Sequence, residues 1–113
     1  MKVLRIYMSG KTKRKGSLTF WKKIFSGSLA GFLINEAKNV GIEQALIYKI
    51  EAGYLKGQPL MFDAVEARPI EFPICLELID RKEKLDRFLA THNEQLSECR
   101  VVMLDFEEKG LAS

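Results

Sequence analysis

The fold is decided by residues 2–8, which read KVLRIYM. Apolar Leu4, Ile6 and Met8 alternate there with a mixed set of side chains that contains Arg5 and Tyr7. Strict alternation of this kind predicts a half-buried β-strand, because successive side chains of a strand point to opposite faces of its sheet. The chain therefore opens with a strand that has one strongly apolar side.

Three more segments have the composition of strands. Residues 44–50 are rich in β-branched and aromatic side chains, and residues 72–79 read FPICLELI with a proline near the start, where a missing N–H group is tolerated. Residues 99–106 form the last apolar run. Between the second and third strands, residues 55–71 have no clear period, which predicts a long connecting loop.

Two helices separate these strands. Between residues 18 and 40 apolar side chains recur every three or four positions, but Gly27 and Gly31 weaken the middle, so we expect a short helix over 18–25, a break near Ser26 and a main helix over 27–40. Residues 80–83 match a capping box in form, and they predict a second helix with a buried face listed here: Leu85, Phe88, Leu89 and Leu96.

The resulting order, βαββαβ, predicts an α+β ferredoxin-like fold with a four-stranded antiparallel sheet and two helices on one face. At 113 residues a single domain over 1–113 is expected, with a frayed tail at 107–113. The other sheet face would show Val3, Arg5, Tyr7, Cys75, Glu77 and Ile79, with either Val101 and Met103 or Val102 and Leu104. Such a partly apolar face indicates self-association, the alternative being an ordinary solvated antiparallel face.

Charge is distributed unevenly along the chain. Residues 1–35 carry eight of the 18 basic residues and none of the 15 acidic ones. The cluster at Lys11, Lys13, Arg14 and Lys15 would attract polyanions such as nucleotide phosphates, nucleic acid or anionic headgroups, unless it is only a solvated loop. Trp21 lies in an aromatic and cationic element, residues 20–25, that suits a membrane interface or a partner helix, although such a stripe is more often core.

A candidate anion site follows the second strand. Tyr54, Lys56 and Gly57 place a stacking ring, an ammonium group and a flexible backbone within four residues, and Arg68 closes the same loop. These groups could hold a small anion by charge-assisted hydrogen bonds. The alternative is a solvated loop with a turn at Gly57.

Catalytic and metal chemistry have little support in the sequence. His92 is the single histidine, and it falls near the end of the second helix, where a structural role is more common. Cys75 and Cys99 lack the spacing of a zinc site and are expected to behave as small buried hydrophobes in a reducing cytoplasm. We therefore expect no enzyme, no required cofactor and no metal. No stretch is long and apolar enough to span a bilayer.

Several short motifs, in this order and spacing, resemble the PII-like family of small proteins of unassigned function. They are residues 4–8 with the Lys-rich loop ending at Gly16, residues 36–42 leading into Ala45, Gly53-Tyr54, and Pro73-Ile74 before residues 77–80. The resemblance spans most of the chain.

The resemblance implies a PII-like homotrimer whose sheets line a central core, with residues 55–71 as the T-loop of PII-type signalling proteins. It places a ligand cleft between subunits near Lys49, Gly53 and Tyr54. The implied function is a cytoplasmic regulator that senses a small anionic effector, such as an adenine nucleotide or bicarbonate. It would act on a partner such as an inorganic-carbon or other ion transporter, at times at the inner face of the membrane.

Two alternatives use the same fold. One is a nucleic-acid-binding module that uses the basic segment 11–23, but the central strands offer Tyr7 without the second aromatic residue that such modules use for stacking. The other is a small hydrolase of the acylphosphatase type, for which no arginine and asparagine pair is evident. The regulator is the leading hypothesis, and nucleic acid is not its expected partner.

Overall fold

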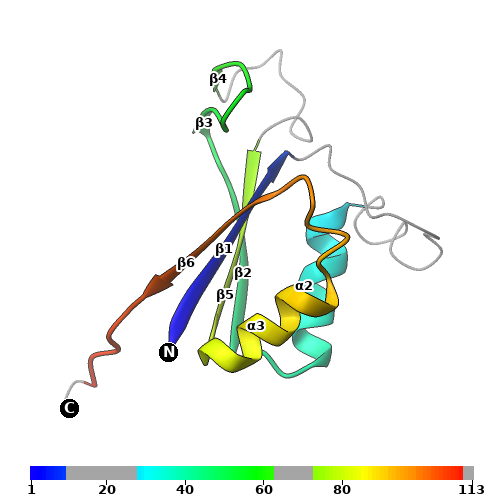
Figure 1. Ribbon diagram of the computed structural model, residues 1–113. Helices are drawn as coiled ribbons and strands as arrows, with labels where there is room; N and C mark the ends of the chain where they lie inside the picture. The colour runs from blue at the N-terminus through cyan, green and yellow to red at the C-terminus, as the bar shows by residue number, and fades with distance from the viewer. Residues whose placement is uncertain (10–27, 63–72, 111–113) are drawn as a thin grey trace.

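The computed structural model describes residues 1–9, 28–62 and 73–110 (Figure 1). Its elements are β1 (Lys2–Ser9), α2 (Leu29–Asn39), β2 (Gln44–Lys49), β3 (Ala52–Gly53), β4 (Met61–Phe62), β5 (Pro73–Asp80), α3 (Lys82–Thr91) and β6 (Arg100–Asp105). Apart from the short β3–β4 ribbon, this is the predicted βαββαβ order. The helix expected over 18–25 lies outside the described residues.

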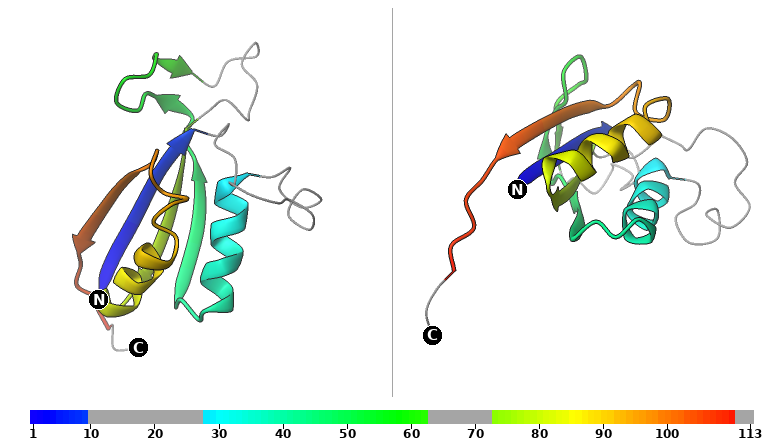
Figure 2. Two further views of the ribbon diagram at one scale, coloured as in Figure 1. Left: turned by 45° about the vertical axis from the view of Figure 1, so that its right-hand side comes forward. Right: turned by 60° about the horizontal axis from the view of Figure 1, so that its bottom comes forward.

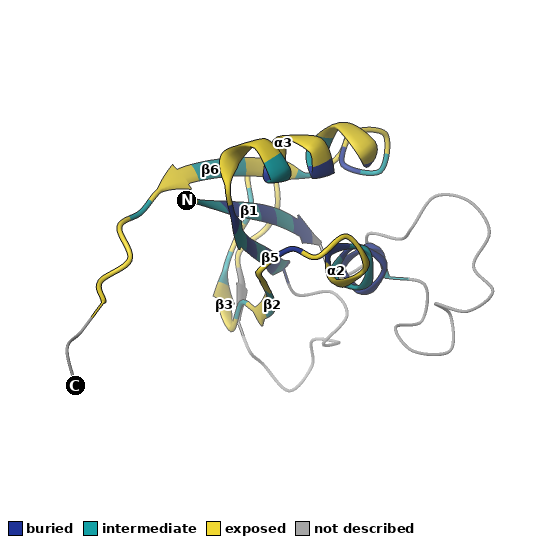
Figure 3. Cartoon of the chain, turned by 90° about the horizontal axis from the view of Figure 1, so that it is seen from below, coloured by how far each residue is buried: buried dark blue, intermediate teal, exposed yellow. Residues whose placement is uncertain are grey.

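The main sheet is antiparallel throughout, with strand order β2-β5-β1-β6. Figure 3, which looks at the sheet from below, shows α2 and α3 on the same side of β1 and β5. Figure 2 shows that the β3–β4 ribbon continues beyond one end of the sheet. The predicted α+β ferredoxin-like architecture is therefore confirmed. The ribbon is an addition: β3 precedes the connection that was expected to be a plain loop over 55–71, and β4 lies within it.

The core lies between the helices and the sheet. The sheet contributes apolar side chains of β1 and β5: Leu4, Ile6, Met8, Leu76 and Leu78. The helices contribute side chains from the inner faces of α2 and α3: Leu29, Phe32, Leu33, Ala37, Leu85 and Phe88. Burying one such large side chain contributes about 1.5–3 kcal/mol relative to leaving it in water.

Helix α2 has clear stop and start signals. The Ser28 hydroxyl oxygen accepts a hydrogen bond from the Gly31 amide at 3.1 Å, so Ser28 caps the first turn of a helix that begins two residues later than predicted. The predicted break near Ser26 lies outside the described residues. At the other end, Gly41 has φ 76° and the Ile42 amide donates to the Ala37 carbonyl at 2.9 Å. This pattern, a Schellman motif, turns the chain towards β2.

The capping box predicted at residues 80–83 is wrong. Strand β5 runs through Asp80, and the N-cap of α3 is Arg81, which makes no side-chain capping bond. The Asp80 carboxylate instead accepts hydrogen bonds from the amides of Glu43 at 2.8 Å and Arg81 at 2.7 Å, and it lies 3.5 Å from Lys84 Nζ. Burial would raise the pKa of Asp80, but these donors outweigh it and hold the pKa below its usual value.

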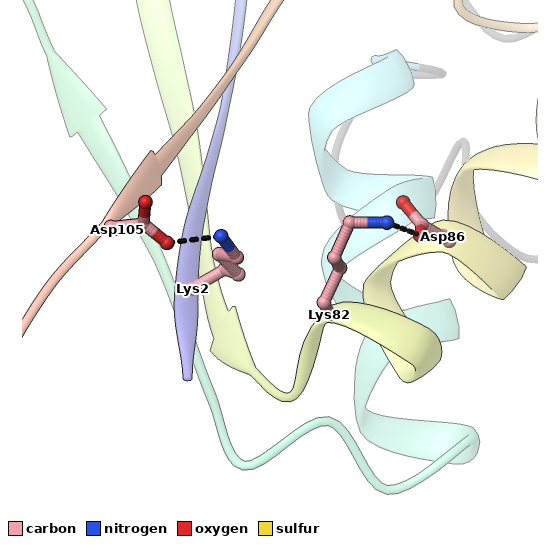
Figure 4. Close-up of polar contacts among 4 residues, drawn as sticks. All are labelled: Lys2, Lys82, Asp86 and Asp105. Carbon is pink, nitrogen blue, oxygen red and sulfur yellow. Dashed lines mark hydrogen bonds and ion pairs between the residues drawn. The ribbon is translucent and has the colours of Figure 1, made fainter.

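Two ion pairs on the surface connect residues of these elements. Figure 4 shows Lys2 of β1 paired with Asp105 of β6, its register partner, and Lys82 paired with Asp86 one helical turn along α3 at 2.6 Å. Exposed pairs of this kind contribute little to stability, typically about 0–1 kcal/mol. The Lys2–Asp105 pair still helps to fix the register of the edge strand β6.

Candidate functional site

Neither α2 nor α3, the two helices that the structure describes, packs on the second face of the sheet. We call it the open face, and its residues are Val3, Arg5, Tyr7, Leu46, Tyr48, Cys75, Glu77, Ile79, Val102 and Leu104. The register pairs Val102 with Arg5 and Leu104 with Val3, which decides between the two alternatives that the sequence left for β6. Leu46, Tyr48 and Leu104 are 41%, 47% and 41% exposed, so this face presents large apolar groups to its surroundings.

One ion pair lies in the middle of the open face. Arg5 Nε donates to Glu77 Oε2 at 3.1 Å across the β1–β5 pairing, and the glutamate side chain is only 13% exposed. Hydrogen bonding to Tyr7 and then to Glu77 raises the pKa of Arg5. Burial raises the pKa of the neighbouring Cys75 thiol, against the opposing effect of Arg5. The thiol is therefore held in its protonated form.

The β3–β4 ribbon depends on two glycines. Gly53 has φ 139° and Gly57 has φ 81°, both in the region that L side chains rarely adopt. The Gln58 amide donates to the Leu55 carbonyl at 2.9 Å and closes a tight turn that has Gly57 at its third position. The turn places Tyr54, Leu55 and Lys56 close to one end of the sheet.

A groove of about 530 Å³ lies between this turn and the end of the sheet. It is lined by Tyr7, Tyr54, Leu55, Lys56, Arg100 and Val102. Tyr7 and Arg100 are register partners on β1 and β6, and Val102 is the next residue of β6 on the same side. The groove therefore opens along the end of the open face, within the size range of about 300–1,000 Å³ that is typical of ligand sites.

The chemistry of the groove favours an anion. Two cationic side chains, Lys56 and Arg100, and two phenols, Tyr7 and Tyr54, line it together with apolar Leu55 and Val102, and none of the lining residues that the structure describes is a carboxylate. An arginine can bind an oxyanion with two parallel hydrogen bonds, a lysine adds a point charge, and an exposed tyrosine ring offers a surface for stacking. Tyr54 is 68% exposed, so its ring is available for such a contact.

The structure brings together part of the site predicted from sequence. Tyr54 and Lys56 line the groove, Gly57 forms the adjacent turn and Gly53 starts the ribbon. Lys49 ends β2, the edge strand opposite β6, and it does not line the groove. The remaining predicted contacts lie outside the described residues: Lys11, Lys13, Arg14, Lys15, Trp21 and Arg68.

Sequence reasoning missed Tyr7 and Arg100 as site residues. Both belong to strands, and they meet only because β1 pairs with β6, which is nearly a full chain length away. The available signal was the alternation of residues 2–8, which places Tyr7 on the face away from the helices. No local pattern marks its pairing with Arg100.

Metal ligation finds no support in the described part of the chain, where no three His, Cys, Asp or Glu side chains cluster. The groove offers positively charged groups, which repel a metal ion. Likewise, no helix in residues 1–9, 28–62 or 73–110 is long and apolar enough to cross a membrane.

Solved structures place this architecture in a class. CPII, a nitrogen regulatory PII-like protein from Thiomonas intermedia K12 solved with ADP, AMP and bicarbonate, is similar with a TM-score of 0.57 and 12% identity, over 90% of this chain and 81% of that one. A PII-like protein from Thermus thermophilus is similar with a TM-score of 0.51 and 17% identity, over 90% and 80% of the two chains. The fold is therefore PII-like.

The sequence defines the family more closely. Residues 1–107 match the DUF190 family, described as "Uncharacterized ACR, COG1993", and the chain belongs to that family. Two UPF0166 proteins of Aquifex aeolicus strain VF5 are similar. One is 31% identical over 88 residues, which are 78% of this chain and 74% of that protein. The other is 29% identical over 68 residues, 60% of this chain and 71% of that protein.

Proposed function

We propose that this protein is a PII-like regulator that senses a small anionic ligand and passes the signal to a partner protein. In this proposal the chain acts as a homotrimer assembled through the open face, and the groove beside Tyr54 and Lys56 becomes a cleft between subunits. The partner would be a transporter of inorganic carbon or of another ion, and the protein would have no catalytic activity of its own.

One observation carries the proposal: the anion-type groove opens onto the edge of the open face. Lys56 and Arg100 converge there from the ribbon turn and from β6. A ligand held between them would connect the ribbon to the sheet, so binding would change the freedom of residues 52–62. A ligand can shift a conformational equilibrium only by binding one state better than another, and this arrangement supplies such a difference.

The open face supports the assembly. Large exposed apolar groups, among them Leu46, Tyr48 and Leu104, lie on one continuous sheet face. A monomeric protein rarely leaves an apolar patch of this kind in water, and closed symmetric assemblies are the usual solution. A neighbouring copy placed on this face would also approach the groove and add a second wall to it.

The described residues offer no evident catalytic machinery. The Cys75 thiol is buried and its pKa is raised, which makes it a poor nucleophile, and His92 is buried on the other side of the sheet. The proposal therefore requires no cofactor. An adenine nucleotide or bicarbonate is the effector to test first, because the similar CPII structure contains ADP, AMP and bicarbonate.

The experiment is a thermal-shift and calorimetric titration of the full chain with ADP, AMP and bicarbonate, with chloride at equal ionic strength as the control. A ligand that binds only the folded state must raise the melting temperature. We expect one of the three to do so, Lys56→Gln and Arg100→Gln to lose most of the shift, and Lys38→Gln, which removes an exposed charge far from the groove, to keep it.

Two results would contradict the ligand proposal. One is the absence of any shift at millimolar concentration of all three compounds. The other is a shift that both groove variants retain. If short RNA binds instead, with an affinity that falls steeply as salt rises, the nucleic-acid alternative replaces the regulator.

A further inference from the structure

A second pocket lies on the helix side of the sheet, away from the open face. It has a volume of about 190 Å³ and lies between the end of α2 and the length of α3. Its lining residues are Val40, Lys84, Arg87, Phe88, Thr91 and His92. The groove described above shares none of these residues, so the two cavities are separate sites.

His92 is the unusual member of this pocket. It is the C-cap of α3 and is 6% exposed, with its ring 5.6 Å from the Phe32 ring and 4.6 Å from the Phe88 ring. No side chain or backbone group in the described parts of the chain hydrogen-bonds to its imidazole. A buried polar group without a partner costs about 1–3 kcal/mol, and the few that occur in native proteins need a reason.

The ring is available to a ligand as a neutral donor and acceptor. Burial lowers the pKa of His92, while the charge of Glu36 on α2 opposes this effect. Neutral imidazole carries one N–H donor and one acceptor nitrogen, and His92 is one of the residues that line the pocket. A group that enters the pocket can therefore hydrogen-bond to the imidazole nitrogens, which have no partner among residues 1–9, 28–62 and 73–110.

Arg87 supplies the charge at the entrance. It is exposed, and its guanidinium makes no ion pair or hydrogen bond with the residues that the structure describes. Lys84, by contrast, is engaged by the Gly41 carbonyl and by the Asp80 carboxylate at 3.5 Å. The Thr91 hydroxyl donates to the Arg87 carbonyl at 2.9 Å. The described lining thus contains one arginine that is free to bind a ligand, and no carboxylate.

The rest of the lining is apolar. The Phe88 ring forms part of the wall. Val40, the C-cap of α2, adds a large apolar side chain that is 55% exposed. A dry engineered cavity of about 150 Å³ holds one benzene molecule. The present pocket can accommodate one ring, or an aliphatic chain of similar size, with a polar group directed at the entrance.

We propose that the α2–α3 pocket binds a small organic monocarboxylate with an apolar body no larger than one ring. Arg87 binds the carboxylate with charge-assisted hydrogen bonds, His92 donates a further hydrogen bond, and Phe88 and Val40 contact the apolar body. This site does not depend on the proposed groove ligand or on assembly through the open face.

The test is an NMR titration of the full chain with benzoate, with benzamide as the neutral control of nearly equal shape. His92 is the single histidine, so its ring signals report on the pocket without overlap. We expect benzoate to shift these signals with saturation at millimolar concentration, and to raise the midpoint of the His92 pH titration, because a bound carboxylate favours imidazolium. Benzamide should produce neither effect.

Variants locate the binding. Arg87→Gln should weaken benzoate at least about tenfold without disturbing the fold, since its side chain is exposed, whereas Arg81→Gln, on an exposed position at the start of α3, should leave affinity unchanged. The proposal is overturned if benzoate shifts the His92 signals no more than benzamide does, or if Arg87→Gln and Arg81→Gln bind benzoate equally. His92→Phe should weaken benzoate binding because it removes the hydrogen bond to the carboxylate, while the phenyl ring keeps the apolar packing.

Discussion

The two faces of the same sheet differ in what covers them. On the helix side, Leu4, Leu76 and Leu78 are fully buried beneath α2 and α3. On the open face the neighbouring residues Val3 and Ile79 are only half-buried, and Leu104 is 41% exposed. Both faces carry large aliphatic side chains on every strand. In an antiparallel sheet whose second face is in water, the side chains on that face are mostly polar. The apolar side chains of the open face therefore favour contact with another protein surface.

The contrast also separates two kinds of stability. Burial under the helices is a property of one chain and does not depend on protein concentration. In the proposed assembly a second copy buries the open face, so this contribution to stability would rise with protein concentration by mass action. Each of the following predictions tests whether the two faces behave in these different ways.

The largest expected effect on stability comes from truncating a core side chain on the helix side of the sheet. Leu78→Ala removes a fully buried side chain and should lower the free energy of unfolding by about 2–5 kcal/mol in urea titrations. Leu46→Ala is the matched change on the open face, where the side chain is 41% exposed, and it should cost less than half as much while weakening association. Equal losses at a concentration where the chain is monomeric would contradict the contrast.

The ion pair on the open face gives a smaller and more specific effect. If a neighbouring copy covers Arg5 and Glu77, Glu77→Leu alone leaves an unpaired buried charge and should cost about 1–3 kcal/mol in the assembled protein. The double variant Arg5→Met with Glu77→Leu should recover most of that loss, because replacing both charges by apolar groups is often neutral or stabilising. Measured by urea unfolding at high protein concentration, a single variant as stable as wild type would show that the pair stays in water.

The smallest expected effect is a pH dependence on the helix side. The pKa of folded His92 lies below its ordinary value of 6.5 because the ring is buried. Between that lowered pKa and 6.5 the unfolded chain binds more protons than the folded one, so stability is complete above about pH 6.5 and is lost as the pH falls through this window. Asp80 acts in the same direction, but only below 3.8.

His92→Phe provides the control for this window. The variant should lose the dependence that begins as the pH falls below 6.5, while keeping the fall at lower pH that arises from carboxylates such as Asp80. Urea unfolding midpoints measured at several pH values decide the question. Parallel curves for the variant and wild type over this interval would mean that His92 titrates alike in the folded and unfolded chain.

Much of the fold could be predicted from the sequence because its signals are local. The alternation over residues 2–8 predicted β1, and the three- and four-residue spacing before Gly41 predicted α2. The β3–β4 ribbon was missed because each of its strands has only two residues, too few for a period to appear. The cap at Asp80 was misassigned because a strand that continues through it uses its carboxylate to bind the Glu43 amide, a contact 37 residues away.

Only those residues of the candidate site that are close together in the sequence could be predicted. Tyr54, Lys56 and Gly57 are close in sequence, so their chemistry could be recognised together. Tyr7 and Arg100 complete the groove from two strands that pair over a long distance, and no spacing rule connects them. The pocket at His92 was equally hard to predict, since its walls come from the end of α2 and from α3. That the imidazole has no hydrogen-bond partner among the described residues is visible only once the helices are packed.

The most direct test of the central claim is the mass of the wild-type protein in solution, measured by light scattering on a size-exclusion column over a range of concentrations. The account predicts a particle of about three chains of 12.9 kDa that dissociates when Leu46→Lys places a charge on the open face, with helix content unchanged. A wild-type protein that remains a stable 12.9 kDa monomer at high concentration would contradict it.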